Sequence, residues 1–277
     1  MAKTTAKTTA KTAAKTVAKK KPARKPARPG TLKKAATHYC PGCGHSIIHR
    51  LVAEVIEEMG LKESTIGVPP AGCAVLAYFY FDVDMIEAAH GRGCATATGI
   101  KRALPEATVF TYQGDGDLAA IGTAELVHAA NRGERITVIF VNNAVYGMTG
   151  GQMAPTTMLG QKTTTSPFGR RARFEGYPIK VCELLSTLEG AAYLERTAVS
   201  SPKGIIKTKK AIRKVFEIQQ QDIGFSLVEI LSACPTNWKK SPVDSWKWID
   251  EAMTPNFPLG VFKDVTKKPE GGAPDAG

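Results

Sequence analysis

Two oxygen-bearing side chains, Asp115 and Asn143, each stand directly after an apolar run near the middle of the 277-residue chain. Asp115 lies in the tetrapeptide GDGD at 114–117, and Asn143 closes the pair NN at 142–143. A carboxylate and an amide oxygen are hard donors of the kind that Mg²⁺ takes, together with phosphate oxygens of a ligand. The two glycines let the backbone approach a phosphate closely. These residues therefore predict a site for an anionic ligand held with a divalent metal.

The segments that carry these residues have the pattern of a strand, a helix and a second strand. Residues 109–112 and 136–141 are short apolar runs typical of buried strands, and residues 118–131 have helical periodicity. A crossover of this kind makes the two strands parallel and is almost always right-handed. Both polar loops therefore leave the same carboxyl edge of one sheet, where open α/β sheets bind ligands.

The rest of the chain contains further apolar segments of an α/β domain. Strands are expected at 65–68, 192–199 and 225–231, and helices at 45–59, 95–104, 179–188, 203–220 and 242–253. Residues 146–173 are rich in Gly, Thr and Pro, and a long irregular segment in a compact domain is usually functional.

The net charge of +12 is concentrated at the N-terminus. Residues 1–34 hold twelve Lys and Arg and no acidic residue, which leaves 25 basic and 25 acidic residues elsewhere. We expect residues 1–36 to form a disordered basic tail that is able to bind a polyanion, residues 37–264 to form one domain, and residues 265–277 to form a mobile tail. Nothing in the charge of the domain itself points to nucleic acid.

Six cysteines occur without a secretory signal or an apolar run long enough to cross a membrane, so we expect a reducing cytoplasm. Four of them stand in expected turns: Cys40, Cys43, Cys73 and Cys234. Such a set is compatible with an iron–sulfur cluster, with a Cys₄ zinc site, or with one reactive pair and two buried thiols. Cys94 and Cys182 are not expected to be ligands, and the cysteines alone leave these alternatives open.

From about residue 37 to residue 264 the chain resembles the β subunit of 2-oxoacid:ferredoxin oxidoreductases. The GDG and NN loops, with about thirty residues from end to end, match the thiamine-diphosphate and magnesium signature. The other matching segments are CPGCGH (40–45), AGCAVLAYFYFD (71–82), HGRGCATATGIK (90–101) and CPTNW (234–238). The resemblance implies the thiamine-diphosphate-binding α/β fold, with a mostly parallel sheet and helices on both faces.

The same resemblance assigns residues to three cofactors. It implies a [4Fe–4S] cluster on Cys40, Cys43, Cys73 and Cys234, and Mg²⁺ on Asp115, Asn143 and the backbone carbonyl of Val145. It places thiamine diphosphate against the residues Gly114, Gly116, Asp117, Tyr146, Gly147, Met148 and Thr149, in a pocket that His90, Gly91 and Arg92 also line.

The implied activity is oxidative decarboxylation of a 2-oxoacid, either 2-oxoglutarate or a branched-chain acid, to acyl-CoA and CO₂, with electrons passing through the cluster to ferredoxin. The implied partners are an α subunit, further γ and δ subunits, ferredoxin, coenzyme A and the 2-oxoacid. The resemblance also implies that the glutamate that activates thiamine comes from the α subunit. Two alternatives stay open: a non-redox thiamine-dependent 2-oxoacid decarboxylase subunit, and a zinc-containing nucleic-acid-binding protein.

Overall fold

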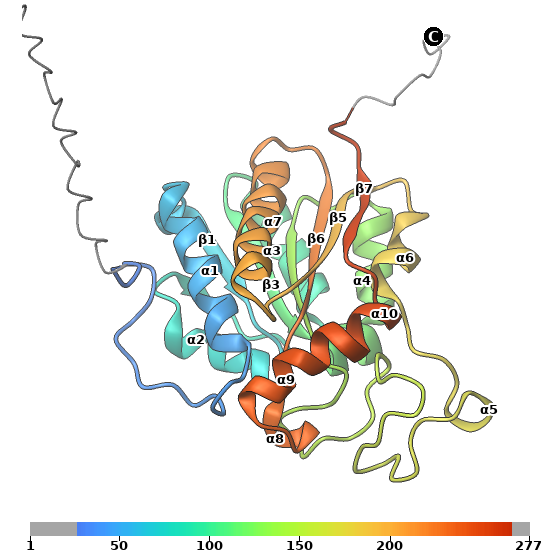
Figure 1. The fold of residues 1–277 in the computed structure, drawn as a ribbon. Coiled ribbons are helices and arrows are strands. Elements are labelled where there is room, and N and C mark those ends of the chain that lie inside the picture. The colour runs from blue at the N-terminus through green and yellow to red at the C-terminus, as the bar shows by residue number, and fades with distance from the viewer. Residues whose placement is uncertain (1–26, 268–277) are drawn as a thin grey trace, which may run out of the picture.

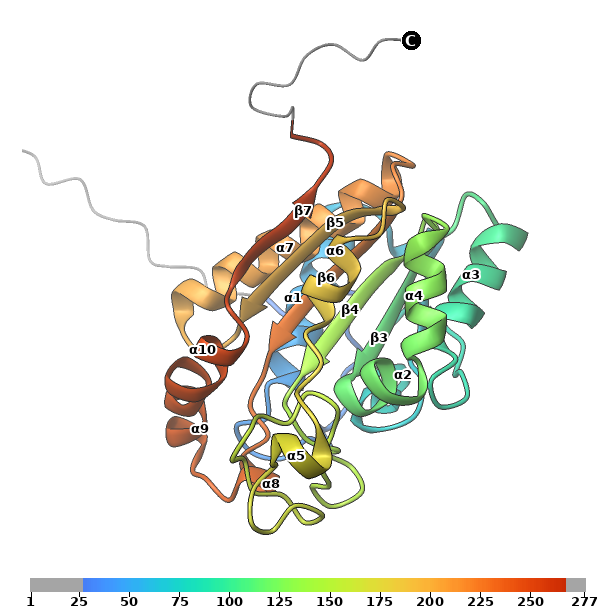
Figure 2. The ribbon, with the colours of Figure 1, turned by 90° about the vertical axis from the view of Figure 1, so that its right-hand side faces the viewer.

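The computed structural model describes residues 27–267 and contains one mixed sheet of seven strands between two layers of helices (Figures 1 and 2). The strand order is β2-β1-β3-β4-β6-β5-β7, and every neighbouring pair is parallel except β5 with β7. The strands are β1 (Thr65–Val68), β2 (Asp84–Met85), β3 (Thr108–Gly114), β4 (Thr137–Asn142), β5 (Ala191–Ala198), β6 (Phe225–Leu231) and β7 (Gly260–Asp264).

Helices cover both faces of the sheet, as predicted (Figure 2). The helices are α1 (His45–Glu58), α2 (Ala77–Tyr80), α3 (Gly93–Ala103), α4 (Thr123–Asn131), α5 (Ala172–Glu175), α6 (Val181–Ser186), α7 (Pro202–Gln220), α8 (Pro235–Trp238), α9 (Pro242–Trp248) and α10 (Thr254–Asn256). Helices α1 and α7 bury their apolar stripes against one face, and α3, α4 and α6 pack on the other. Strand β4 serves both cores, because Ile139 points to the first and Val138 to the second.

A third, smaller apolar cluster lies where the strands end. It joins α9 and the following turn to the loop after β4 through Ile249, Met253, Phe257, Met158 and Ala144. Helices α8 and α9 therefore pack at the carboxyl edge of the sheet, next to the loops expected to bind the ligand (Figure 1). Within residues 27–267, no helix combines the length and the apolar character needed to cross a bilayer.

The structure differs from the expected elements in the middle of the chain and near its end. The helix expected at 118–131 is interrupted, because a π-helical turn at Asp117–Ile121 ends at Gly122 and α4 begins after it. A side chain at Gly122 would lie 2.9 Å from the carbonyl oxygen of Gly91, so this crossing requires glycine. Near the C-terminal end of the described residues, β7 had not been predicted. It forms an antiparallel edge strand on β5.

The packed part of the chain begins before residue 37. The Thr31 hydroxyl is buried and donates to the carbonyl of Ala53 (2.7 Å), and the Lys33 amide donates to the carbonyl of Tyr80 (2.8 Å). The prediction of disorder up to residue 36 was therefore wrong for this stretch, because the repetitive basic pattern ends at Arg28. The rest of the expected tails, at 1–26 and 268–277, lies outside the described residues.

Candidate active site

The loops that follow β3 and β4 lie side by side, as the strand–helix–strand pattern predicted. Gly114 pairs with Val141 in the parallel ladder, so the residues that follow the two strands leave the sheet at the same edge. The side chains of Asp115 and Asn143 are both buried and line one cavity. Between Asn143 and Val145 the backbone of Ala144 adopts a left-handed conformation (φ 59°), which is costly for a residue with a side chain.

This cavity has a volume of about 240 Å³, and we call it the cofactor cavity because the residues expected to bind the cofactor line it. It brings together nearly all of the residues expected to bind the metal and the diphosphate, and these lining residues are His90, Gly114, Asp115, Gly116, Asp117, Asn143, Val145, Tyr146, Gly147, Met148 and Thr149. It is also lined by His45, Ala71, Gly72, Cys73 and Ala74, of which His45, Ala71, Gly72 and Ala74 had not been singled out as site residues. The cavity therefore lies between the two polar loops and the turn that carries a cysteine.

Gly91 and Arg92, which were expected to line the pocket, are not among its lining residues. Arg92 forms an ion pair with Glu125 on α4, so its guanidinium is directed along the helix layer. A side chain at Gly91 would lie within 2.6 Å of Ile121, which shows how tightly the backbone packs there. The structure therefore does not place these two residues in the cavity wall: Arg92 pairs with Glu125, and the backbone of Gly91 packs against Ile121.

The carboxylate of Asp117 organises the wall of the cofactor cavity. Its Oδ1 lies 2.7 Å from Nδ1 of His90 and accepts from the amide of Gly91 (2.6 Å), while its Oδ2 accepts from the side-chain amide of Gln113 (2.6 Å). Three partners thus use the oxygens of a carboxylate that is almost fully buried. Asp117 holds His90 and the 90–91 turn in place and has few free positions for a ligand.

Asp115 has the environment that a metal ligand requires. Burial raises its pKa to about 6, although hydrogen bonds from the Thr156 hydroxyl (2.7 Å) and the Gly116 amide (2.8 Å) lower it. A cation bound next to this carboxylate would offset the cost of keeping its charge away from water. The oxygens of Asp115, Asn143 and Val145 on one cavity wall therefore fit Mg²⁺.

Two glycines lie where the chain passes close to other groups, and Gly116 leaves no room for a side chain. A Cβ atom on Gly116 would lie 2.4 Å from the Tyr146 ring. A Cβ atom on Gly147 would lie 3.3 Å from the sulfur of Cys73 and 3.7 Å from the sulfur of Cys234. The loop expected to bind the diphosphate therefore runs directly past two of the four thiols.

The four thiols from three separate turns form one group. In every pairing of Cys40, Cys43, Cys73 and Cys234, a charge on one sulfur raises the pKa of another, in addition to the larger effect of burial. Together these effects raise the pKa of Cys43 to about 12 and that of Cys73 to about 11. Backbone amides of His45 and Asn237 donate to the sulfurs of Cys43 and Cys234.

Within residues 27–267, no three His, Cys, Asp or Glu side chains are arranged around the position of a single metal ion. An iron–sulfur cluster is held by thiolates whose sulfurs accept hydrogen bonds from nearby amides. The four grouped thiols and the amide donors to Cys43 and Cys234 are compatible with such a cluster.

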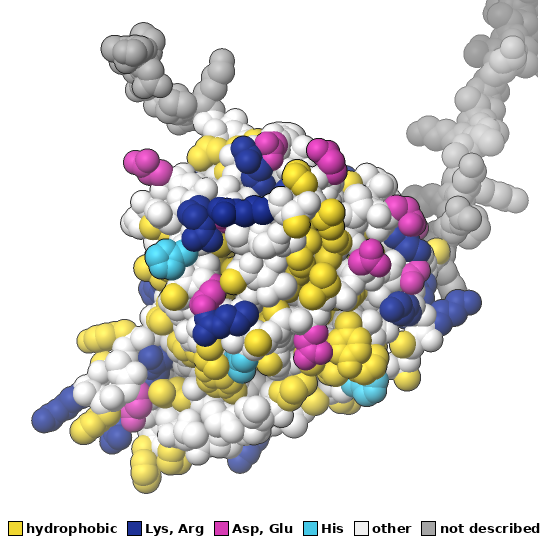
Figure 3. Space-filling view, turned by 180° about the vertical axis from the view of Figure 1, so that it is seen from behind, with side chains coloured by type: hydrophobic (Ala, Val, Ile, Leu, Met, Phe, Trp, Pro, Cys, Tyr) yellow, Lys and Arg dark blue, Asp and Glu magenta, His cyan; other side chains and the backbone are white. Residues whose placement is uncertain are grey.

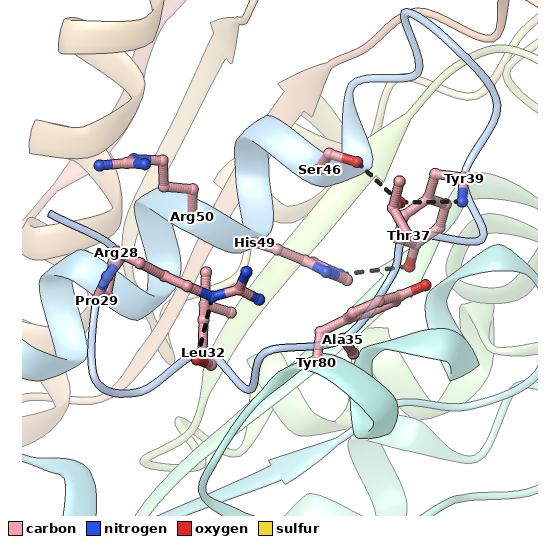
Figure 4. Close-up of a pocket in the computed structure, with 10 residues that line it drawn as sticks. All are labelled: Arg28, Pro29, Leu32, Ala35, Thr37, Tyr39, Ser46, His49, Arg50 and Tyr80. Atoms are coloured by element: carbon pink, nitrogen blue, oxygen red, sulfur yellow. Dashed lines mark hydrogen bonds between the residues drawn. The ribbon is translucent and has the colours of Figure 1, made fainter. Parts of the chain in front are cut away.

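A second cavity of about 340 Å³ is lined by Tyr39, His49 and Tyr80 among other residues (Figure 4). A layer of aromatic and histidine side chains connects its wall to that of the cofactor cavity. His45 lines the cofactor cavity, and its ring stacks on that of Tyr39 at a centroid distance of 4.9 Å. Tyr39 and His49 line the second cavity, and the Tyr39 hydroxyl donates to the carbonyl of Cys73 (2.9 Å). This layer therefore holds the turn at Cys73 in place on the side facing the second cavity.

The buried histidines of this layer should make the fold sensitive to acid. Burial lowers the pKa of His45 to about 4, so between pH 6.5 and pH 4 the unfolded chain binds a proton that the folded chain does not. We expect this residue alone to remove about 2 kcal/mol of stability between pH 7 and pH 5. Urea unfolding at both pH values measures the loss. His45→Gln should reduce it and His128→Gln, at an exposed position on α4, should not; equal losses in both variants would contradict the assignment.

Comparison with known proteins agrees with this geometry. Residues 72–230 match the family model described as thiamine pyrophosphate enzyme, C-terminal TPP binding domain. The chain is 49% identical over 235 residues to ketoisovalerate oxidoreductase subunit VorA of Methanothermobacter marburgensis, covering 85% of this chain and 49% of that protein. It is 37% identical over 215 residues to 2-oxoglutarate synthase subunit KorB of Archaeoglobus fulgidus, covering 78% of this chain and 76% of that one.

A solved structure shares the fold. It is the 2-oxoglutarate:ferredoxin oxidoreductase from Magnetococcus marinus, determined with 2-oxoglutarate, coenzyme A and succinyl-CoA bound, which matches with a TM-score of 0.70 at 24% identity. The match covers 86% of this chain and 84% of that chain. The chain spans about half the length of the ketoisovalerate oxidoreductase subunits that it resembles.

Proposed function

Because this chain belongs to the family of thiamine pyrophosphate enzymes that includes the subunits of 2-oxoacid oxidoreductases, we propose that it is the cofactor-binding subunit of such an enzyme. The complete enzyme would convert a 2-oxoacid and coenzyme A to acyl-CoA and CO₂ and pass two electrons through a [4Fe–4S] cluster to ferredoxin. One observation carries the proposal. Gly147 lies against the sulfurs of Cys73 and Cys234, and it belongs to the loop 146–149 that is expected to bind the diphosphate, called the cofactor loop below. A cofactor at this loop and a cluster on these thiols would be neighbours.

The residues of the cofactor cavity have separate tasks in this proposal. Asp115, Asn143 and the carbonyl of Val145 would hold Mg²⁺, and the loop 146–149 together with Gly114 and Gly116 would receive the diphosphate. Thiamine diphosphate, when bound, supplies the nucleophilic carbon and the electron sink that decarboxylation of a 2-oxoacid needs. The protein contributes position, charge and the exclusion of water.

The cavity lacks one group that this chemistry requires. Its lining residues within the described part of the chain include Asp115 and Asp117 but no glutamate, so we propose that the activating glutamate comes from an α subunit. The loop 144–180 offers a surface for that subunit next to the cavity. Arg170 donates to six backbone carbonyls of this loop and makes it rigid, whereas Phe168, Phe174 and Tyr177 remain exposed.

The region around α5 projects from the body of the protein and displays apolar and basic side chains together (Figure 3). A rigid surface that exposes aromatic residues loses little conformational entropy when a partner covers it, and aromatic and arginine residues are typical of protein interfaces. The α subunit is therefore the partner that we assign to this loop.

Among the possible substrates we favour a branched-chain 2-oxoacid. The ketoisovalerate oxidoreductase subunit is 49% identical to this chain and the 2-oxoglutarate synthase subunit 37% identical. The non-redox decarboxylase alternative is weaker, because such an enzyme has no use for four interacting thiols beside the cofactor loop. The basic tail lies outside the described residues, and we retain polyanion binding as a separate proposal for it.

The test uses the full-length tagged chain, purified without oxygen together with the polypeptides that bind it. We expect iron and acid-labile sulfide in the chain, and coenzyme A-dependent reduction of a viologen dye with ketoisovalerate faster than with 2-oxoglutarate or pyruvate. Faster turnover of 2-oxoglutarate would reassign only the substrate. Decarboxylation without iron or a requirement for coenzyme A would favour the non-redox alternative and overturn the proposal.

A further inference from the structure

The short helix α8 connects the last of the four thiols to the cofactor loop. It begins directly after Cys234, and the side-chain amide of its third residue, Asn237, donates to the sulfur of Cys234 (3.2 Å) and to the carbonyl of Gly147 (2.8 Å). The backbone amide of Asn237 also donates to the same sulfur. One residue therefore directs two donors at a thiol and a third hydrogen bond at the loop expected to bind the diphosphate.

The side chain of Asn237 is fixed in this position by close packing. Gly151, which adopts a left-handed conformation (φ 80°), faces it so closely that a Cβ atom there would lie 3.0 Å from both Cβ and Oδ1 of Asn237. The next residue, Trp238, donates from its indole nitrogen to the backbone carbonyl of Asn143 (3.0 Å). Consecutive residues of α8 thus contact the cofactor loop and an expected magnesium ligand.

Gly147 receives this contact at the point where the two sites are closest. A Cβ atom at this position would lie within 4 Å of the sulfurs of Cys73 and Cys234 and of Nδ2 of Asn143. A shift of the loop therefore changes the surroundings of two sulfurs, and a shift of α8 changes the position of the loop.

We propose that Asn237 is a positioning residue that links the thiol cluster to the cofactor loop, setting the reduction potential of the bound cluster and the affinity of the loop for thiamine diphosphate. This inference rests on the proposed function. Hydrogen bonds to a ligand sulfur stabilise the extra negative charge of the reduced cluster and so raise its potential. Loss of the Asn237 donor therefore shifts the potential to more negative values.

Asn237→Ala removes both side-chain N–H donors without adding a charge, and Asn237→Asp removes them in a side chain of the same shape while adding a negative charge that acts in the same direction. In the full chain with its partner subunits, we expect a more negative midpoint potential in an EPR-monitored redox titration. We also expect about tenfold weaker binding of thiamine diphosphate with Mg²⁺. Loss of a residue that orients a metal ligand usually lowers affinity by about 10- to 100-fold, and this value is at the lower end of that range. Asn237→Ala should change both quantities in the same direction. The control is Thr236→Ala, at the exposed neighbouring position of α8, which should change neither.

Iron content is measured first, because it separates failure of this inference from failure of the proposed function. Wild-type protein without a cluster would overturn both. Asn237 variants that hold a full cluster at the wild-type potential would overturn this inference and leave the proposed function standing. If the Asp and Ala variants do not retain iron, the binding of thiamine diphosphate with Mg²⁺ is compared between the iron-free wild-type chain and the Asn237→Ala chain; an unchanged affinity in the variant would likewise overturn the inference.

Discussion

Replacement of Asp115 by asparagine is expected to weaken the binding of thiamine diphosphate with Mg²⁺ by about 100-fold or more, with a corresponding loss of activity. Asparagine keeps the size of the side chain and its contact with Thr156, so the change removes mainly the negative charge. A factor of 100 corresponds to about 2.8 kcal/mol, a moderate value for the loss of a charged metal ligand from a buried site.

The same substitution should have the opposite effect on the stability of the metal-free chain. Burial raises the pKa of Asp115 to about 6, so the folded chain loses stability as the pH rises from about 4 to 6 and the carboxylate must ionise. At pH 7 the asparagine variant avoids this cost and should unfold at a higher urea concentration. Calorimetric titration and urea unfolding measure the two effects.

A matched control for this experiment is Asp84→Asn at an exposed position of β2, which should change neither binding nor stability. Weaker cofactor binding combined with lower stability in Asp115→Asn would indicate general disruption of the loop. Unchanged binding would show that Asp115 does not hold the metal.

The arrangement of Asp115 and Asn143 was predictable because it follows from local pattern and a topological rule. Two apolar runs separated by a helical segment must form parallel strands, and parallel strands bring their carboxyl ends to one edge. The ladder between β3 and β4 has this form, and both side chains line one cavity. No distant contact was needed to place them.

Residues whose direction depends on a distant partner were not predictable in this way. Arg92 was expected in the pocket and instead pairs with Glu125, thirty-three positions later in the chain. His45 was predicted as the last residue of the CPGCGH segment and the first of a helix, but not as a site residue. It lines the cofactor cavity, and its Nδ1 lies 2.8 Å from the Tyr112 hydroxyl. The only sequence signal for this burial is the apolar stripe of the helix that His45 begins.

The edge strand β7 was missed for a related reason. Gly260–Asp264 is short and only half-buried, and the Pro and Gly residues near it are typical of a loop. It forms because the edge of β5 offers unpaired backbone groups. Its partner is more than sixty residues away in the sequence, so pairing and not local preference decides its conformation.

Replacement of Arg196 by methionine is expected to destabilise the fold by about 3–5 kcal/mol, the cost of leaving a buried charge without its partner. The guanidinium of Arg196 is fully buried in β5, its Nε lies 2.8 Å from the carboxylate of Glu229 in β6, and Glu229 is itself fully buried. Glu229 also accepts a hydrogen bond from the side chain of Asn142 (2.8 Å), the residue before the expected magnesium ligand.

The double variant Arg196→Met, Glu229→Gln removes the unpaired charge and should recover part of the stability in urea unfolding. The control is Arg135→Met, whose ion pair with Asp222 is exposed and should contribute less than about 1 kcal/mol. If Arg196→Met lowers the free energy of unfolding by less than about 1 kcal/mol, this role is contradicted. If the same variant binds the cofactor more weakly and the double variant restores binding, the buried pair also positions the loop after β4.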